Sequence, residues 1–183
     1  MAKGKHSLAL DRRRSGIESV IDAYQAPLLR YAGRLINNAT LAQDVVQNAL
    51  VKLFRQWQPG MQPGAQLRNW LYRVVHNESV DAIRTEERHK RIQNAQADAV
   101  ACLAPDGCAE TPPPDEREVL VTRCLDLLPT AQRQVLLLRM QQGLSYEEIA
   151  AVTGFSIGYV GNLLHLAIKG LSVEVRRLEG EKP

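Results

Sequence analysis

The sequence predicts an all-α protein of two small helical domains, the second a helix-turn-helix, joined by an extended acidic linker. Apolar residues recur at helical spacing over most of the chain, which indicates amphipathic helices. Aromatic residues make up only 5% of the sequence, which disfavours a β-sheet protein. A segment rich in Ala, Pro and Asp ends in Thr-Pro-Pro-Pro and cannot continue a helix. The 183 residues allow one large domain or two small ones, and this division favours two.

The predicted first domain begins with a helix over residues 17–36, in which Pro27 suits a helix start or a kink. Residues 37–40 form a polar break, and the hydroxyl of Thr40 is suited to cap the next helix, over residues 41–57. In that second helix we expect the following residues to be buried: Val45, Leu50, Leu53 and Phe54.

A loop over residues 58–65 contains two prolines and two glycines, which exclude helix and strand there. The helix that follows, over residues 67–91, becomes strongly charged toward its end. Its basic end suits contact with nucleic acid. The alternative is a solvated helix end, because the helix dipole by itself favours basic residues near a C-terminus. The chain therefore divides into four segments: a basic N-terminal tail (1–16), a first domain (17–91), a flexible acidic linker (92–114) and a second domain (115–178).

The second domain carries three helical patterns between residues 127 and 171. Ser145 and Glu148 form a capping box at the start of the middle helix, and Gly154 suits the left-handed position after its end. Ser156 can cap the last helix, so the pattern indicates a helix-turn-helix, with an ordinary helical hairpin as the alternative. The expected apolar positions are Val135, Leu136, Leu138 and Met140 in the first helix, and Ile157, Val160, Leu164, Ala167, Ile168 and Leu171 in the last.

Charge is distributed unevenly along the chain. Residues 1–91 carry 15 Lys and Arg against 8 Asp and Glu, whereas residues 92–118 carry 1 against 6 and residues 119–183 carry 7 against 6. A basic first domain suits a polyanion such as nucleic acid, and the acidic segment does not. The two segments therefore present different surfaces to partners.

Several classes of protein are disfavoured. The N-terminus lacks the apolar run of a secretory signal, and no segment approaches the roughly 18 apolar residues that cross a bilayer. Cys102, Cys108 and Cys124 are odd in number and form no Cys-x-x-Cys pair, so we expect a reduced, cytoplasmic protein without a metal site. Because no nucleophile–base pair or phosphate-binding loop is present, we predict neither an enzyme nor a cofactor.

These stretches together resemble the bacterial RNA polymerase sigma factors of the extracytoplasmic-function type, within the sigma-70 family. The matching stretches are YQAPLLRYAGRLI, AQDVVQNALVKLFRQW and LRNWLYRVVHNESVDAIR in the first domain, and LPTAQRQVLLLRMQQGLSYEEIAAVTGFSIGYV in the second. The resemblance implies a transcription initiation factor that binds core RNA polymerase and directs it to promoter DNA. A region 2-like first domain would melt the −10 element, a region 4-like second domain would recognise the −35 element, and an anti-sigma factor or another protein is a possible further partner.

The resemblance also implies a role for each surface of the first domain. A face of the second helix would dock on the clamp coiled coil of the largest polymerase subunit, although the family usually has an acidic residue where Asn48 stands. The loop and the third helix would open the −10 element, with Trp57 and Trp70 beside it; Trp70 suits the core better than a stacking platform. The acidic linker would thread the channel of the nascent RNA, or be simply solvated. The core-binding residues would be Asp44, Gln47, Asn48, Leu50 and Phe54, and the −10 residues Gln58, Met61, Gln62, Asn69, Arg73, Asn77, Arg84 and Arg88.

The last helix departs from the family, which usually has Lys or Arg near Gly161, Leu163 and Leu166. Leucine cannot form the bidentate bond to guanine. One hypothesis is a sigma factor that reads the −35 element weakly, or through polar side chains and apolar contacts to thymine methyl groups. Another is a sigma-like adaptor that binds a protein through Leu163 and Leu166, and a third is a conventional helix-turn-helix regulator, which would not need the first domain. The −35 residues would be Ser156, Tyr159, Asn162, His165 and Lys169.

Overall fold

The computed structural model describes residues 3–58, 61–96 and 122–180, and every regular element in these ranges is an α-helix. The predicted all-α class is thus confirmed. The predicted acidic linker, with Cys102 and Cys108, lies outside the described residues, as do Pro59 and Gly60 of the loop. The helices are α1 (Lys3–Ile36), α2 (Ala39–Gln56), α3 (Ala65–Gln96), α5 (Thr130–Gln142), α6 (Tyr146–Thr153) and α7 (Ile157–Gly180).

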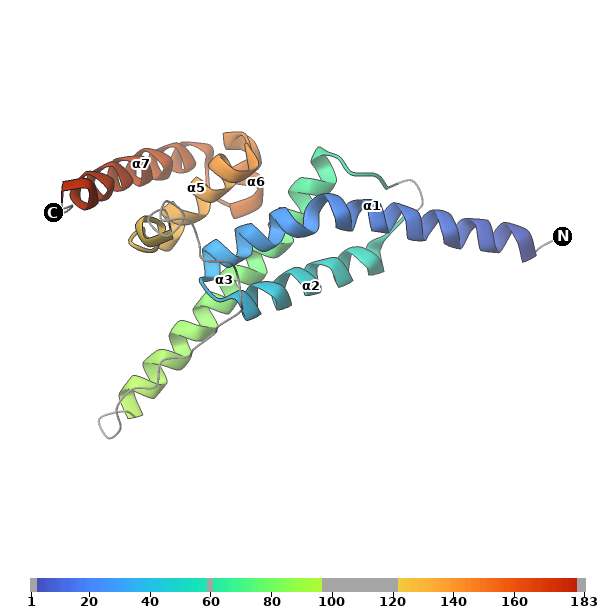
Figure 1. The fold of residues 1–183 in the computed structure, drawn as a ribbon, viewed down its shortest axis with the longest axis horizontal. Coiled ribbons are helices and arrows are strands. Elements are labelled where there is room, and N and C mark those ends of the chain that lie inside the picture. The colour runs from blue at the N-terminus through green and yellow to red at the C-terminus, as the bar shows by residue number, and fades with distance from the viewer. Residues whose placement is uncertain (1–2, 59–60, 97–121, 181–183) are drawn as a thin grey trace.

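The first domain is a bundle in which α1, α2 and α3 lie side by side and contact one another (Figure 1). The N-terminal part of α1 and the C-terminal part of α3 reach beyond the bundle in opposite directions (Figure 1). Because α1 begins at Lys3, it includes most of the residues that the sequence assigned to a separate tail. Fully buried side chains between the three helices include Leu28, Tyr31, Leu35, Val46, Leu53, Leu71, Tyr72 and Val75.

Two details of α2 differ from the prediction. The helix is capped by Asn38 and not by Thr40, since the Asn38 Oδ1 accepts a hydrogen bond of 3.1 Å from the backbone N–H of Leu41. Phe54 was expected in the core but is 55% exposed, and Leu50 is half-buried. The reason is the helical turn of about 100° per residue: once Leu53 points inward, the next side chain points sideways.

The second domain confirms the predicted caps. Ser145 and Glu148 form a complete capping box on α6, and Gly154 ends this helix with a φ of 76°, in the left-handed region. The Ser156 Oγ accepts a hydrogen bond of 3.3 Å from the backbone N–H of Tyr159 and so caps α7. Gly143 ends α5 in the same left-handed conformation, with a φ of 63°.

The apolar stripes of the second domain were only partly predicted. Met140 of α5 is 73% exposed, and Ile157 and Ile168 of α7 are 49% and 55% exposed. Ile157 and Ile168 lie about 70–90° around the helix from the centre of the buried arc, too far to reach the neighbouring helices. That arc consists of Val160, Leu163, Leu164 and Ala167, and α5 contributes Val135, Leu136, Leu137 and Leu138 to the same core.

The two domains pack against each other. Helix α1 contacts α5, and α3 contacts α6, so the second domain covers one side of the first (Figure 1). Among the helices that the structure describes, none is by itself both long and apolar enough to cross a bilayer. The helices α6 and α7 meet that test only as a pair, and the pair is bent by 101°.

A buried histidine makes the stability of the first domain depend on pH. His76 is 4% exposed, and its Nδ1 lies 2.9 Å from the Tyr31 hydroxyl. Burial lowers the pKa of His76 to about 4, so the folded state keeps the imidazole neutral, whereas the unfolded chain takes up a proton below a pH of about 6.5. Between these two values the unfolded state binds more protons, and stability therefore falls as the pH falls.

We expect His76 to remove roughly 2–3 kcal/mol of the unfolding free energy between pH 7 and pH 4.5. Urea denaturation at the two pH values measures this loss. The variant His76→Asn, whose amide can still form a hydrogen bond with the Tyr31 hydroxyl, should lose less stability on acidification, while His89→Asn on the exposed side of α3 should behave like the wild type. An unchanged pH dependence in His76→Asn would assign the acid sensitivity to other groups.

Candidate partner and nucleic-acid interfaces

One face of α2 carries the residues predicted to dock on a partner. Asp44, Gln47 and Asn48 are exposed there, and Asp44 has no ion-pair partner among the described residues. Val51, which is not among the predicted docking residues, continues this face and is 46% exposed. Phe54 extends one flank of this face. Its side chain was expected in the core but is exposed, and it therefore adds an aromatic ring to the surface. We call these five residues the α2 face; half-buried Leu50 borders it, and its mixed polar and apolar side chains suit a helical partner.

The loop between α2 and α3 borders a cavity of about 610 Å³. Met61 and Gln62 line it from the loop, and Trp70 lines it from α3, while Gln58 is exposed just after α2. The Tyr24 hydroxyl donates a hydrogen bond of 3.3 Å to the Gly64 carbonyl and so fixes the end of the loop to α1. The cavity combines apolar walls with glutamine amides, which suits a planar, hydrogen-bonding ring.

The two tryptophans have different positions. Trp57 is 7% exposed, and its ring packs so closely on α1 that a Cβ added at Gly16 would lie 2.8 Å from it. Trp70 is half-buried: one part packs against the core and another lines the cavity. The expectation that Trp70 belongs to the core is therefore correct for only part of the side chain.

The predicted polar residues of α3 lie along one side of the helix. Their spacing of four or seven residues brings them to one face, which we call the α3 stripe. Asn69 is half-buried and the other four are exposed. Asn77 and Arg84 also line a cleft of about 520 Å³, whose other wall includes Gln134 of α5 and Phe155. The α3 stripe consists of Asn69, Arg73, Asn77, Arg84 and Arg88.

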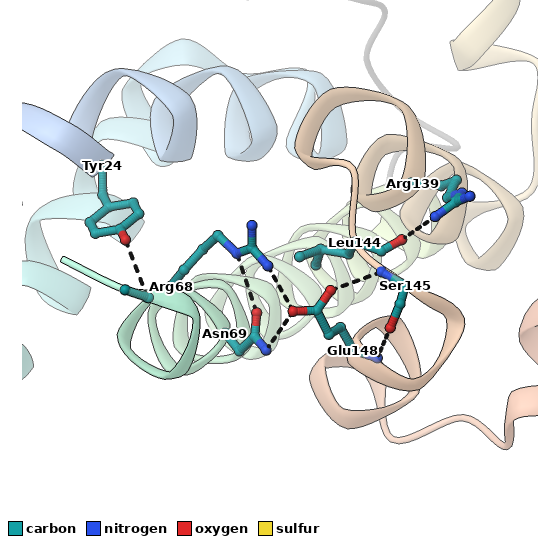
Figure 2. A network of polar contacts seen from close by, with 8 residues as sticks. Tyr24, Arg68, Asn69, Arg139, Leu144, Ser145 and Glu148 are labelled. Carbon is teal, nitrogen blue, oxygen red and sulfur yellow. Dashed lines mark hydrogen bonds and ion pairs between the residues drawn. The ribbon is translucent and has the colours of Figure 1, made fainter.

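A polar network connects the α3 stripe to the second domain (Figure 2). One carboxylate oxygen of Glu148, Oε1, accepts hydrogen bonds from Arg68 Nη2 at 2.7 Å and from Asn69 Nδ2 at 3.1 Å. The other, Oε2, accepts from the backbone N–H of Ser145 at 2.9 Å, as the capping box requires. The bonds from Ser145, Asn69 and Arg68 lower the pKa of Glu148, so this carboxylate is charged. The sequence predicted the cap but not the contact with α3, whose partners are 79 and 80 residues apart.

The outer face of α7 carries the remaining predicted residues. Tyr159, Asn162, His165 and Lys169 are exposed on it, and Ser156 is exposed at the start of the helix. We use the name α7 face for Tyr159, Asn162, His165, Leu166 and Lys169. Leu166 is 41% exposed among them.

Leu163 does not belong to the α7 face. Its side chain is only 4% exposed and packs in the core of the second domain, so it cannot contact a partner protein as the adaptor hypothesis expected. A Lys or Arg in this buried position would be desolvated. Gly161 lies beside Tyr146, whose ring would be 3.6 Å from an added Cβ.

Comparisons with known proteins cover both domains. Residues 20–89 match Sigma-70 region 2, and residues 118–171 match Sigma-70, region 4. The ECF RNA polymerase sigma factor SigL of Mycobacterium tuberculosis is 29% identical over 88% of this chain and 90% of its own length. The RNA polymerase sigma-E factor of Streptomyces avermitilis is 31% identical over 86% of this chain and 84% of its own. The sigma factor RpoE of Bartonella quintana, solved in complex with the anti-sigma factor NepR, shares the fold at 24% identity, with a TM-score of 0.65 over 87% of this chain and 96% of that one.

Proposed function

This chain belongs to the extracytoplasmic-function (ECF) group of the sigma-70 family and is a transcription initiation factor, and from this premise we propose how its surfaces divide the steps of initiation. A single observation supports the division: the three predicted sets of residues occupy three separate surfaces, one on α2, one on α3 and its preceding loop, and one on α7. Each surface offers the chemistry that its step requires. The protein acts by binding, without catalysis of its own.

The α2 face is our proposed docking site for core RNA polymerase. Its exposed apolar side chains, Val51 and Phe54, can be desolvated against a helical partner, which favours association. Asp44 supplies the charge that selects a basic partner, and Asn48 offers hydrogen bonds where the family usually has an acid. Most of the opposite face of α2 is buried in the domain, so docking needs no rearrangement of the bundle.

We propose that the cavity beside Trp70 and the α3 stripe hold the opened −10 element. Extruding a base costs a few kcal/mol, which stacking and hydrogen bonds in a fitted pocket can offset. Trp70 provides an aromatic wall, and Gln62 provides an amide that can bond a base edge. Arg73, Arg84 and Arg88 are placed for phosphate contacts. Each contact to the opened strand would steepen the salt dependence of binding, by about 0.7 log units of the binding constant for each tenfold change in salt concentration.

The α7 face is our proposed reader of the −35 element. An α-helix fits the major groove, and Asn162 is suited to adenine there. The capped start of α7 and the exposed side chains that follow match the usual docking of a recognition helix. Leu166 leaves a position in the middle of this face without a donor, so we expect −35 binding to be weak.

We therefore expect Leu166→Arg to tighten binding to duplex DNA with the −35 element by about fivefold or more, because one new contact to a guanine or phosphate contributes roughly 1–3 kcal/mol. Electrophoretic mobility shift on the upstream half of a transcribed promoter measures this. The matched control is Ile168→Arg, which adds the same charge to another exposed apolar position on a different side of α7. Equal gains in both variants would mean nonspecific attraction. No gain at Leu166, with loss of a protein partner, would instead support the adaptor.

Further partners and location follow from the same proposal. We propose that the protein works in the cytoplasm, where its polymerase and promoter are found. An anti-sigma factor is a further proposed partner, because the fold is shared with a sigma factor that was solved with one. The acidic linker, which lies outside the described residues, is proposed to lie in the RNA channel, since its charge resembles that of nucleic acid.

A further inference from the structure

We infer that Gly158 is a positioning residue for the α7 face: because it has no side chain, the start of α7 lies close to the bases of the major groove, and Asn162 then reaches an adenine. This inference rests on the proposed function, because it concerns how the proposed −35 surface reads its element. It adds that the element contains an adenine opposite the first turns of α7.

The fold itself does not require a glycine at position 158. The residue is the second of α7, and it is exposed. Among the described glycines a positive φ is found at Gly143 and Gly154, so the backbone at Gly158 suits any residue. A Cβ added there would meet no atom of the described residues within 4 Å. Glycine at this position therefore weakens the helix relative to alanine without a reason from packing.

Two other glycines of α7 differ from Gly158 in this respect. A Cβ added at Gly170 would lie 3.3 Å from Leu128 Cδ2, which is a tight contact. A Cβ added at Gly161 would lie 3.6 Å from the ring of Tyr146, which is an ordinary contact. Position 158 is thus open toward solvent, and a reason for its glycine has to be sought in what binds there.

Gly158 lies at the centre of the side of α7 that points away from the protein. At about 100° per residue it is nearly opposite the centre of the buried arc of this helix. It also lies within about 40° of three exposed residues of the α7 face, Asn162, His165 and Lys169. DNA that contacts the α7 face therefore meets position 158 as well.

Asn162 is the neighbour that depends most on this position. Side chains of an α-helix point back toward its N-terminus, so a residue covers the surface over the residue about four positions before it. Asn162 stands in this relation to Gly158, one helical turn away. A side chain at position 158 would occupy the space between the Asn162 amide and the floor of the groove.

The dimensions of the groove explain why the missing side chain matters. The major groove is about 12 Å wide and 8.5 Å deep, and an α-helix with its side chains is about 10–12 Å across. The helix therefore fills the groove, and the side chains on its inner side set how deep it lies. Asparagine is short, so its paired hydrogen bonds to adenine N6 and N7 require a close backbone. Glycine is the residue that permits such a close approach.

Two substitutions in the full-length protein test this role. Gly158→Ala adds one methyl group, and Gly158→Leu adds a larger side chain. Both should raise the thermal midpoint of the second domain, by roughly 2–6 °C, because alanine and leucine are better helix formers. Both should nevertheless weaken binding to a duplex with the −35 element, by about fivefold for alanine and more for leucine. Fluorescence anisotropy on the −35 duplex of a transcribed promoter measures the affinity.

A double-mutant cycle shows whether Gly158 acts through Asn162. Asn162→Ala should weaken −35 binding by about fivefold or more in the wild type, but it should have no further effect in Gly158→Leu. Replacing the adenines of the element one at a time by 7-deazaadenine, which lacks the N7 acceptor, should weaken the wild type at one position. The same replacement should not weaken Asn162→Ala.

Two controls separate close approach from other effects. A scrambled duplex is held by phosphate contacts, so the wild type and the Gly158 variants should bind it equally. Gly161→Ala removes the other glycine from the first turns of α7 but lies about 60° around the helix from Gly158. We expect it to keep the affinity of the wild type for the −35 duplex. Equal losses in Gly158→Ala and Gly161→Ala would assign the effect to flexibility of α7 and overturn the inference.

Three further results would contradict the role of Gly158: unchanged −35 affinity in Gly158→Leu, additive losses in the double-mutant cycle, or a lower thermal midpoint in Gly158→Ala. The wild type on the −35 and scrambled duplexes separates these results from failure of the proposed function. If the wild type prefers the −35 duplex and Gly158→Leu shows the same preference, the inference is wrong and −35 reading stands. If the wild type shows no preference, the proposed −35 surface and the inference both fall.

Discussion

The variant Asp44→Arg should lose at least roughly a hundredfold in affinity for core RNA polymerase, because a like charge placed in a matched interface costs several kcal/mol. Asp44 is exposed in the middle of the α2 face, so reversing its charge should not disturb the fold. Biolayer interferometry with immobilised core polymerase measures the loss. Run-off transcription should fall in parallel, since a sigma factor that does not dock cannot initiate.

A matched control for this variant is Asp22→Arg, which reverses an exposed carboxylate on α1 of the same domain. We expect its affinity for core polymerase to stay within a few-fold of the wild type, and both variants to unfold at the wild-type temperature. If Asp44→Arg binds as tightly as Asp22→Arg, the polymerase docks elsewhere and the α2 face loses its assignment.

The second large effect is expected from Ile149→Ala. Ile149 is fully buried between the helices of the second domain, and truncating such a side chain to alanine typically costs 2–5 kcal/mol. A domain of this size has only about 5–15 kcal/mol of stability, so much of it would be lost. We expect the thermal transition of the second domain to fall sharply and −35 binding to weaken, while docking of the first domain on core polymerase persists.

Ile168→Ala controls for the loss of an isoleucine as such. Ile168 is 55% exposed on α7, so its truncation should change stability by less than about 1 kcal/mol. Differential scanning calorimetry of both variants makes the comparison. Similar destabilisation by the two substitutions would contradict the packing described for α6.

Local signals in the sequence predicted local structure well. The capping box at Ser145 and Glu148, the left-handed Gly154 and the Ser156 cap all depend on residues within one helical turn of each other, and all three are confirmed. The cap of α2 was misassigned because Asn38 and Thr40 are both good caps and lie two residues apart. The N-cap preferences of the two residue types do not by themselves indicate which of two such neighbours caps the helix.

The burial of individual apolar residues was harder to predict. In α7 apolar side chains occupy more than half of the circumference, and periodicity alone does not say which part of that arc meets α5 and α6. Leu163 is therefore buried, whereas Ile157 and Ile168, which were expected on the buried stripe, are exposed. Phe54 shows the same limit in α2, and there the exposed aromatic side chain contributes to a proposed docking face.

The contact between the two domains could not be predicted from the sequence. Arg68 and Glu148 are 80 residues apart, and each has an ordinary local explanation: an arginine in the first turn of a helix and a capping glutamate. Only the three-dimensional arrangement shows that one carboxylate serves both the cap of α6 and the contact with α3. The exposure of most of the polar residues proposed for function, by contrast, was predictable because it follows from helical spacing.

The most direct measurement is run-off transcription with this protein and bacterial core polymerase on a library of promoter fragments, with start sites mapped by sequencing. We predict initiation that depends on the protein, at fragments that share one motif at the −10 position, and a loss of these transcripts with Asp44→Arg. Absence of protein-dependent transcripts, although core polymerase is active with another sigma factor, would contradict this prediction.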